Sequence, residues 1–97
     1  MSVYELVFTR GAQSEYAALD GSVRNMVDKG LARLRVRPDE IGKQLSGPLA
    51  SCRELKFRGD GLRVIYRIRN GQVCIVDILA IGQRDRGKVF TDAQRRL

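Results

Sequence analysis

The residues of this chain that are best suited to chemistry are basic side chains near one predicted turn. Lys56 and Arg63 stand on either side of that turn, and Arg84 comes shortly after the next predicted strand. Cationic groups that converge in this way can hold a phosphate and stabilise the negative charge that develops on it. The chain has no histidine, which excludes catalysis by paired imidazoles, and no carboxylate cluster fit for two metal ions. We therefore expect a site that uses neither a metal nor another cofactor.

These basic residues belong to a β-hairpin that the sequence predicts from Ser51 to Asn70. Asp60-Gly61 is a strong hairpin signal, because both central residues of a type I′ turn need positive φ angles. With a two-residue turn there, the predicted register pairs Arg58 with Arg63, Phe57 with Val64, Lys56 with Ile65, Leu55 with Tyr66 and Glu54 with Arg67. Side chains alternate across a strand, so one face is apolar (Leu55, Phe57, Val64, Tyr66) and the other is cationic (Glu54, Lys56, Arg58, Arg63, Arg67).

The net charge of +7 is concentrated in the second half of the chain. Residues 1–50 hold seven Lys or Arg against six Asp or Glu, whereas residues 51–97 hold eleven against five. A localised positive field favours polyanions, most often nucleic acid or an acidic protein segment, and makes binding sensitive to salt. The alternative is that the charge serves solubility alone.

Length and composition are those of a soluble globular protein, and we expect one domain over residues 1–97. Apolar residues make up 43% of the chain and charged residues 30%. No window is apolar enough for a membrane span, and the first residues do not have the pattern of a secretory signal. Cys52 and Cys74 lack metal-ligand spacing, so we expect packed free thiols in a reducing compartment. These features predict a cytoplasmic protein.

The first half of the chain predicts one strand and two helices. Residues 2–9 are rich in β-branched and aromatic residues and favour an opening strand. Residues 12–19 favour a short helix, and an apolar stripe over residues 23–34 favours a second helix with Ser22 as its N-cap. Pro38 ends this second helix, and residues 37–50 form a loop. The two helices are expected to form a hairpin that packs on a sheet.

The second half predicts the remaining strands. Asn70-Gly71 is a second two-residue turn signal, and it leads into residues 73–81, which are apolar on both faces except for Asp77. A strand buried on both faces is usually central in its sheet. The tail after Phe90 forms a short helix capped by Thr91 or stays mobile. The predicted architecture is β-α-α-β-β-β with a short C-terminal helix, an α+β fold in which one face of a mostly antiparallel four-stranded sheet carries the helical hairpin.

The order of short motifs along nearly the whole chain resembles the RelE/ParE superfamily of bacterial toxins, and its RelE branch in particular. The motifs are Arg-Gly-Ala at 10–12, Leu-Asp at 19–20, Leu-Ser-Gly at 45–47, Arg-Glu-Leu-Lys-Phe-Arg at 53–58, Gly-Leu-Arg-Val-Ile-Tyr-Arg-Ile at 61–68 and Ala-Ile-Gly-Gln-Arg-Asp-Arg-Gly-Lys-Val-Phe at 80–90. None is as specific as a zinc-site pattern. Their combination and order carry the resemblance.

The resemblance implies the toxin of a type II toxin–antitoxin pair. Such a toxin enters the ribosomal A site and cuts the translated mRNA without a metal, by attack of the ribose 2′-OH on the adjacent phosphate. Its partners are the ribosome, mRNA and a cognate antitoxin, whose partly disordered acidic segment wraps the fold in a hetero-oligomer.

The resemblance also implies roles for individual residues. Lys56 matches a family lysine that transfers a proton, and Arg63 and Arg84 match arginines that hold the scissile phosphate. Glu54 and Phe90 depart from the family pattern, which has a lysine and a tyrosine at these positions. Glu54 is either a general base or the partner of Arg67 in a cross-strand ion pair. The residues expected to contact RNA are Arg58, Arg67, Arg86, Lys88 and Phe90.

Two other functions stay open from the sequence. The first is a ParE-like toxin that inhibits DNA gyrase by protein–protein contact and cuts no RNA, since Glu54 and Phe90 leave room for it. The second is a catalytically silent relative that binds a partner or regulates a promoter. Substitution of Arg84 would leave the toxicity of a gyrase inhibitor largely intact.

Overall fold

The computed structural model of the chain describes residues 3–57, 59 and 61–97. Its strands form one five-stranded sheet in the order β1-β5-β4-β3-β2, in which β1 runs parallel to β5 and the other pairs are antiparallel. Along the chain, the elements are β1 (Glu5–Phe8), α1 (Arg10–Ala17), α2 (Gly21–Leu34), β2 (Lys43–Gln44), the 3₁₀ helix η1 (Gly47–Leu49), β3 (Cys52–Lys56), β4 (Leu62–Arg69), β5 (Ile75–Gln83), the 3₁₀ helix η2 (Asp85–Gly87) and α3 (Lys88–Arg95).

The predicted α+β class is confirmed, and the sheet differs from the prediction by one strand. The additional strand, β2, has two residues and lies in the stretch predicted as a loop, where so short a segment shows no alternating pattern. The expected interior position of the last strand is confirmed, because β5 lies between β1 and β4. Within the described residues, no helix is long and apolar enough to cross a membrane.

Two side-chain caps start the helices of the helical hairpin. The Thr9 hydroxyl accepts a hydrogen bond from the Ala12 amide at the start of α1, and the Asp20 carboxylate accepts one from the Val23 amide at the start of α2. The predicted N-cap Ser22 is wrong, because Ser22 lies inside α2 and donates its hydroxyl to Asp20. The Asp20 carboxylate, two residues earlier, accepts from the Val23 amide, which has no backbone partner at the start of the helix.

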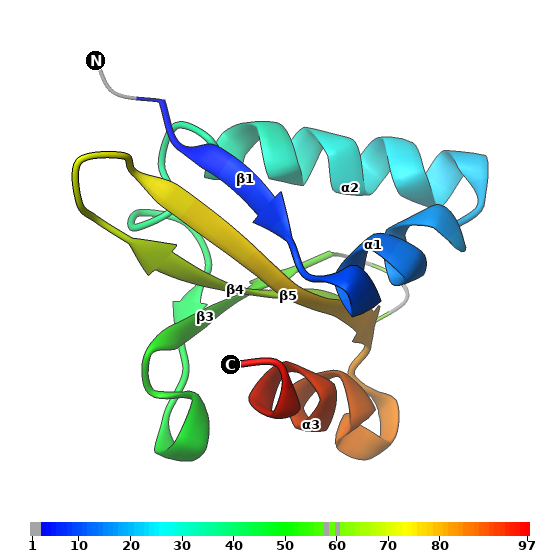
Figure 1. Ribbon diagram of the computed structural model, residues 1–97. Helices are drawn as coiled ribbons and strands as arrows, with labels where there is room; N and C mark the ends of the chain where they lie inside the picture. Colours follow the sequence, from blue (N-terminus) through cyan, green and yellow to red (C-terminus); the bar gives the residue numbers. More distant parts are fainter. Residues whose placement is uncertain (1–2, 58, 60) are drawn as a thin grey trace.

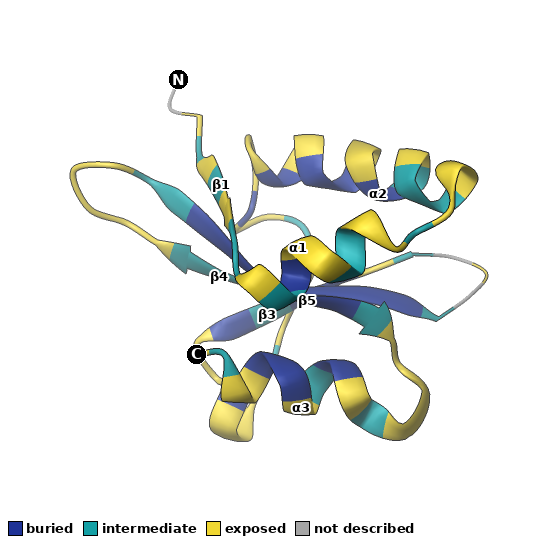
Figure 2. Cartoon of the chain, turned by 45° about the vertical axis from the view of Figure 1, so that its right-hand side comes forward, coloured by how far each residue is buried: buried dark blue, intermediate teal, exposed yellow. Residues whose placement is uncertain are grey.

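The helical hairpin covers one face of the sheet, and α3 covers the other (Figures 1 and 2). On the first face, apolar residues of α2 meet those of the strands around Tyr66, which is fully buried and donates its hydroxyl to the carbonyl oxygens of Pro38 and Ile41. On the second face, Val89 and Ala93 of α3 pack in a smaller cluster that includes Ile65 of β4. The sheet is therefore the middle of three layers.

Helix α3 begins earlier than predicted. Gly87, at φ 68°, is its N-cap, and Thr91 lies inside the helix with its hydroxyl donated to the Gly87 carbonyl oxygen. A left-handed residue at this point suits glycine, which has no Cβ to clash. The chain therefore turns back directly after β5, and Val89 packs 3.5 Å from the position that a Cβ of Gly82 would occupy.

The two predicted turns are wrong in length. In the first hairpin Lys56 pairs with Arg63, and Phe57 donates its amide to the Leu62 carbonyl oxygen, so the connection runs over 58–61. Gly59 and Gly61 have positive φ angles, whereas Asp60 of the predicted turn lies outside the described residues. In the second hairpin Arg69 pairs with Ile75, and the connection runs over 70–74 rather than a two-residue turn.

The longer first connection moves the register by two residues and leaves the two faces as predicted. Leu55 pairs with Val64 and Glu54 with Ile65, in place of the predicted partners Tyr66 and Arg67. Because side chains alternate with a period of two, a shift of two returns every side chain to its original face. For the described residues of the hairpin, the apolar and cationic faces are therefore confirmed although the register is wrong; Arg58 lies outside them.

The two cysteines are free thiols in different surroundings. Cys52 is buried in β3, and burial raises the pKa of its thiol. Cys74 precedes β5 instead of lying within a strand as predicted, and it is half-buried.

Candidate active site

The three expected basic residues lie at one end of the sheet. Lys56 is the last residue of β3 and faces Arg63, near the start of β4. On the other side of Arg63, its partner in β5 is Gly82, and Arg84 follows the end of β5. The Arg84 amide donates to the Gly61 carbonyl oxygen at 2.9 Å, which ties the end of β5 to the hairpin loop. Sheet pairing therefore gathers residues that are far apart in the sequence.

Arg63 is buried, whereas the other two basic residues are exposed. Arg63 is 8% exposed and donates from Nη1 to the Leu62 carbonyl oxygen at 3.3 Å. Its Nε is buried and has no hydrogen-bond partner within the described part of the chain. The Lys56 side chain is 55% exposed, and Arg84 is exposed as well. The site thus combines one buried guanidinium with two cations that reach solvent.

Glu54 lies between two of these cations. It is 6% exposed, and its Oε1 atom is 3.9 Å from both Lys56 Nζ and Arg63 Nε. Both distances are those of ion pairs and are too long for hydrogen bonds. The predicted ion pair between Glu54 and Arg67 is wrong, because the actual register places Ile65 opposite Glu54.

Arg67 is bound to another carboxylate on the same sheet face. Asp77 of β5 accepts from Arg67 at 3.2 Å and from Arg69 at 2.6 and 2.9 Å. The hydrogen bond from Arg69 lowers the pKa of Asp77, against the opposing effect of burial, and Arg67 lowers it further. Arg67, which the sequence predicts to contact RNA, thus already donates to Asp77 within the protein.

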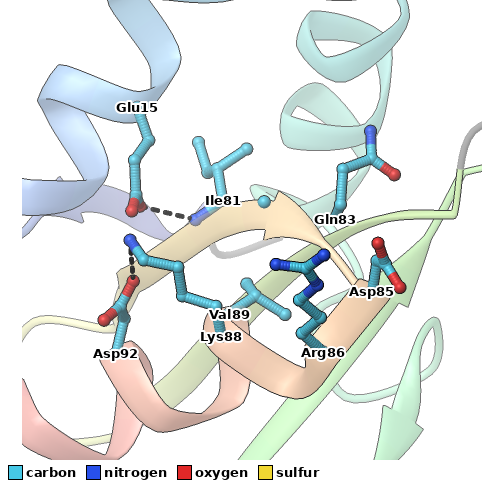
Figure 3. A pocket seen from close by; sticks show the side chains of 9 residues that line it. Glu15, Ile81, Gln83, Asp85, Arg86, Lys88, Val89 and Asp92 are labelled. Atoms are coloured by element: carbon cyan, nitrogen blue, oxygen red, sulfur yellow. Dashed lines mark hydrogen bonds and ion pairs between the residues drawn. The ribbon is translucent and has the colours of Figure 1, made fainter.

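The expected RNA contacts near α3 border a cavity of about 350 Å³ (Figure 3). Arg86, at φ 63°, and Lys88 line it, and Lys88 donates to Asp92 at 3.3 Å. Burial raises the pKa of Asp92, but the hydrogen bonds from Arg95 and Lys88 outweigh burial and hold the pKa below its usual value. Phe90 is half-buried against the smaller apolar cluster. The remaining expected RNA contact, Arg58, lies outside the described residues.

One cationic residue next to the site is missed by the sequence analysis. Lys43 pairs with Glu54 across β2 and β3, and the two line a cavity of about 310 Å³ together with Lys56. No pattern in the sequence places Lys43 there, because β2 is too short to show alternation. In a stretch that contains Gly42 and Gly47, a lysine is typical of an exposed loop.

The sequence comparison and the structure comparison both find RelE toxins. No protein-family model matches the chain. The chain is 29% identical over 94 residues to the mRNA interferase toxin RelE of Escherichia coli K12, and the match covers 97% of each chain. Its fold matches that of an arginine double mutant of E. coli toxin RelE in the free state, with a TM-score of 0.83, 26% identity and 98% of each chain covered. In sequence and in fold, the chain is thus similar to RelE toxins.

The RelE fold also occurs in a solved complex with which this chain can be compared. The intact E. coli RelBE toxin–antitoxin complex contains a chain that matches with a TM-score of 0.68 and 26% identity, covering 86% of this chain and 99% of that one. In the site of this chain, Glu54 brings a buried negative charge between Lys56 and Arg63.

Proposed function

We propose that this protein is the toxin of a type II toxin–antitoxin system and that it cleaves translated mRNA in the ribosomal A site. The observation that carries the proposal is the gathering of Lys56, Arg63 and Arg84 at one end of a RelE fold. The relative that is 29% identical is itself named an mRNA interferase. We propose that residues 1–97 form one toxin domain that acts in the cytoplasm, where ribosomes are.

The reaction needs no atom from outside the RNA and the protein. The ribose 2′-oxygen attacks the adjacent phosphorus, the bond from phosphorus to the 5′-oxygen breaks, and the products are a 2′,3′-cyclic phosphate and a 5′-OH. The proton of the 2′-OH leaves with a base, and the 5′-oxygen gains one from an acid. Lys56 takes the proton-transfer role: its ammonium, on a side chain that is 55% exposed, gives a proton to the 5′-oxygen, while the proton of the 2′-OH passes to solvent water. Arg63 and Arg84 stabilise the negative charge on the five-coordinate phosphorus.

RNA and antitoxin are proposed to bind to the same positively charged surface. Arg86, Lys88 and Phe90 are proposed to contact RNA beside the cavity near α3, and Arg58 and Arg67 to contact it on the hairpin. An antitoxin with an acidic segment would cover this cationic surface and exclude the ribosome. The solved RelBE complex shows that a related toxin binds an antitoxin.

Primer extension on a defined mRNA in a translating extract tests the proposal. The wild-type protein is expected to cut only translated codons and only when ribosomes are present. Arg84→Ala is expected to lose this cleavage, because it removes a cation from the phosphate. Arg33→Ala is the matched control, since Arg33 is an exposed arginine on α2, on the other side of the sheet. It is expected to cut like the wild type.

The contrary outcome is equally clear. If the wild-type protein cuts no mRNA and translation continues, the nuclease proposal is wrong. A supercoiling assay with DNA gyrase then tests the ParE-like alternative. Inhibition of gyrase by the wild type and by Arg84→Ala alike would establish that alternative.

A further inference from the structure

Glu54 is the one site residue whose role the gathering of cations does not explain. We propose that Glu54 is a positioning residue, which holds the guanidinium of Arg63 in its phosphate-binding orientation, and that it does not take the proton of the 2′-OH. This inference rests on the proposed function. The negative charge of Glu54 inside the site then serves to orient the cation of Arg63.

The burial of both partners supports this role. The side chains of Glu54 and Arg63 are 8% and 10% exposed, and they come from adjacent strands. A buried guanidinium is costly unless a carboxylate and hydrogen bonds offset the loss of water. Glu54 is the only carboxylate that forms an ion pair with Arg63 in the described part of the chain. Among the described residues, Glu54 is therefore the one electrostatic anchor of Arg63.

The vacant donor of Arg63 indicates how the anchor works. Nε has no hydrogen-bond partner within the described residues and lies 3.9 Å from Glu54 Oε1. Hydrogen bonds of catalytic groups are often long in the free enzyme and shorten when substrate binds. A small rotation of the guanidinium toward Glu54 would form the Nε hydrogen bond. The guanidinium would then be held at its Nε side, and its terminal nitrogens would be left for the phosphate.

The same geometry argues against Glu54 as the base. A general base must come within about 3 Å of the hydroxyl that it deprotonates. The Glu54 carboxylate is buried, and the 55% exposed side chain of Lys56 lies next to it. RNA that approaches from solvent therefore meets the ammonium of Lys56 before it meets the carboxylate.

Glu54 is expected to pair more strongly with Arg63 than with Lys56. The ion pair with Lys56 involves an exposed, flexible side chain, and such pairs contribute little. The pair with Arg63 is shielded from water on both sides. Removal of Glu54 is thus expected to act through Arg63 and only weakly through Lys56.

Single-turnover cleavage on mRNA-programmed ribosomes separates positioning from base catalysis. Glu54→Gln keeps an oxygen that accepts from Arg63 Nε but cannot act as a base. We expect it to stay within about fivefold of the wild type, whereas Glu54→Ala loses about 10- to 100-fold, the effect of one hydrogen bond to a charged group. In an Arg63→Ala background, Glu54→Ala should cost less than about twofold more, because its target is gone. If Glu54→Gln is as inactive as Glu54→Ala, Glu54 is the base and the inference is wrong.

A second measurement on the free protein does not depend on cleavage. The free protein holds the Arg63 guanidinium by its 3.9 Å ion pair with Glu54, so the order parameter of Arg63 Nε, followed by ¹⁵N relaxation, should fall in Glu54→Ala relative to the wild type. Equal order parameters in the two proteins would overturn the anchoring role. If the wild type cuts no mRNA, the proposed function fails, while this measurement still decides whether Glu54 holds Arg63. Thermal melts of each variant confirm that the fold is intact.

Discussion

Two buried carboxylates on the same face of the sheet are each flanked by two cations, yet their contacts differ. Asp77, near the start of β5, lies within 2.6–3.2 Å of nitrogen atoms of Arg67 and Arg69. Glu54, in β3, lies 3.9 Å from the nearest nitrogen of each of its two partners. Both carboxylates are 6% exposed. Burial is thus the same, and the number of hydrogen bonds separates them.

The difference indicates which cluster serves the fold and which serves a ligand. The Asp77 carboxylate is satisfied, and the hydrogen bond from Arg69 lowers its pKa although burial acts in the other direction. In the Glu54 cluster, the donor Nε of Arg63 is left without an acceptor among the described residues. A native structure rarely leaves such a donor unpaired, and the exceptions often lie at functional sites. We therefore infer that the Asp77 cluster stabilises the sheet, whereas the unpaired donor of the Glu54 cluster is the feature expected of a ligand site.

The largest expected difference between the two clusters is in the activity of variants at their arginines. Arg63→Ala is expected to lower single-turnover cleavage of ribosome-bound mRNA by about 10²–10³-fold, the loss typical of one preorganised donor to a developing oxyanion. Arg69→Ala removes the same side chain from the far end of β4 and should leave the rate near that of the wild type. Equal losses in the two variants would remove the functional distinction between the clusters.

The second prediction reverses the comparison and concerns stability. Asp77→Ala removes hydrogen bonds to two arginines and is expected to lower the free energy of unfolding by about 1–2 kcal/mol. The loss stays at this level because both arginine side chains can turn to solvent, being 33% and 51% exposed. Urea unfolding measures it, with Asp39→Ala as the control at an exposed carboxylate. A loss no larger than that of the control would show that the Asp77 cluster does not stabilise the sheet.

The pH dependence of stability sharpens the same point. Because folding lowers the pKa of Asp77, its charged form stabilises the protein above the unfolded-state pKa of about 3.9, and this contribution disappears as the pH falls through the folded-state pKa. The difference in unfolding free energy between wild type and Asp77→Asn should be constant from about pH 7 to 5.5 and shrink below about pH 4. Urea titrations at stepped pH follow it. A difference that grows toward low pH would contradict the lowered pKa.

Much of the fold follows from alternation in the sequence, and the register does not. The face on which Leu55, Val64 and Tyr66 lie is correct, because a shift by two residues preserves the side of each residue. The register depends on the connection at 58–61, where glycines at 59 and 61 both take positive φ angles. Asp-Gly alone cannot distinguish a two-residue turn from this longer one.

The candidate site was predicted in part for the same reason. Lys56, Arg63 and Arg84 fall at one end of the sheet because strand order and face are enough to place them. The partner of Glu54 was not predicted, since an ion pair depends on register as well as face. The early start of α3 was also missed, because Gly87 acts through its left-handed backbone and provides no side-chain cap that a sequence pattern would show.

The smallest expected effect on stability concerns Lys56, and it separates stability from activity within one residue. The Lys56 side chain is 55% exposed and has only a 3.9 Å ion pair with Glu54 in the described part of the chain, so Lys56→Met should change the free energy of unfolding by less than about 0.5 kcal/mol. Methionine is close to lysine in length, but it lacks the ammonium group and therefore the proton to be transferred. Cleavage should nevertheless fall by about 10²–10⁴-fold, the contribution typical of general acid–base catalysis. Urea unfolding and single-turnover cleavage of the same preparation give both numbers. If Lys56→Met cleaves at the wild-type rate, proton transfer belongs to another group, and Glu54 becomes the first residue to test.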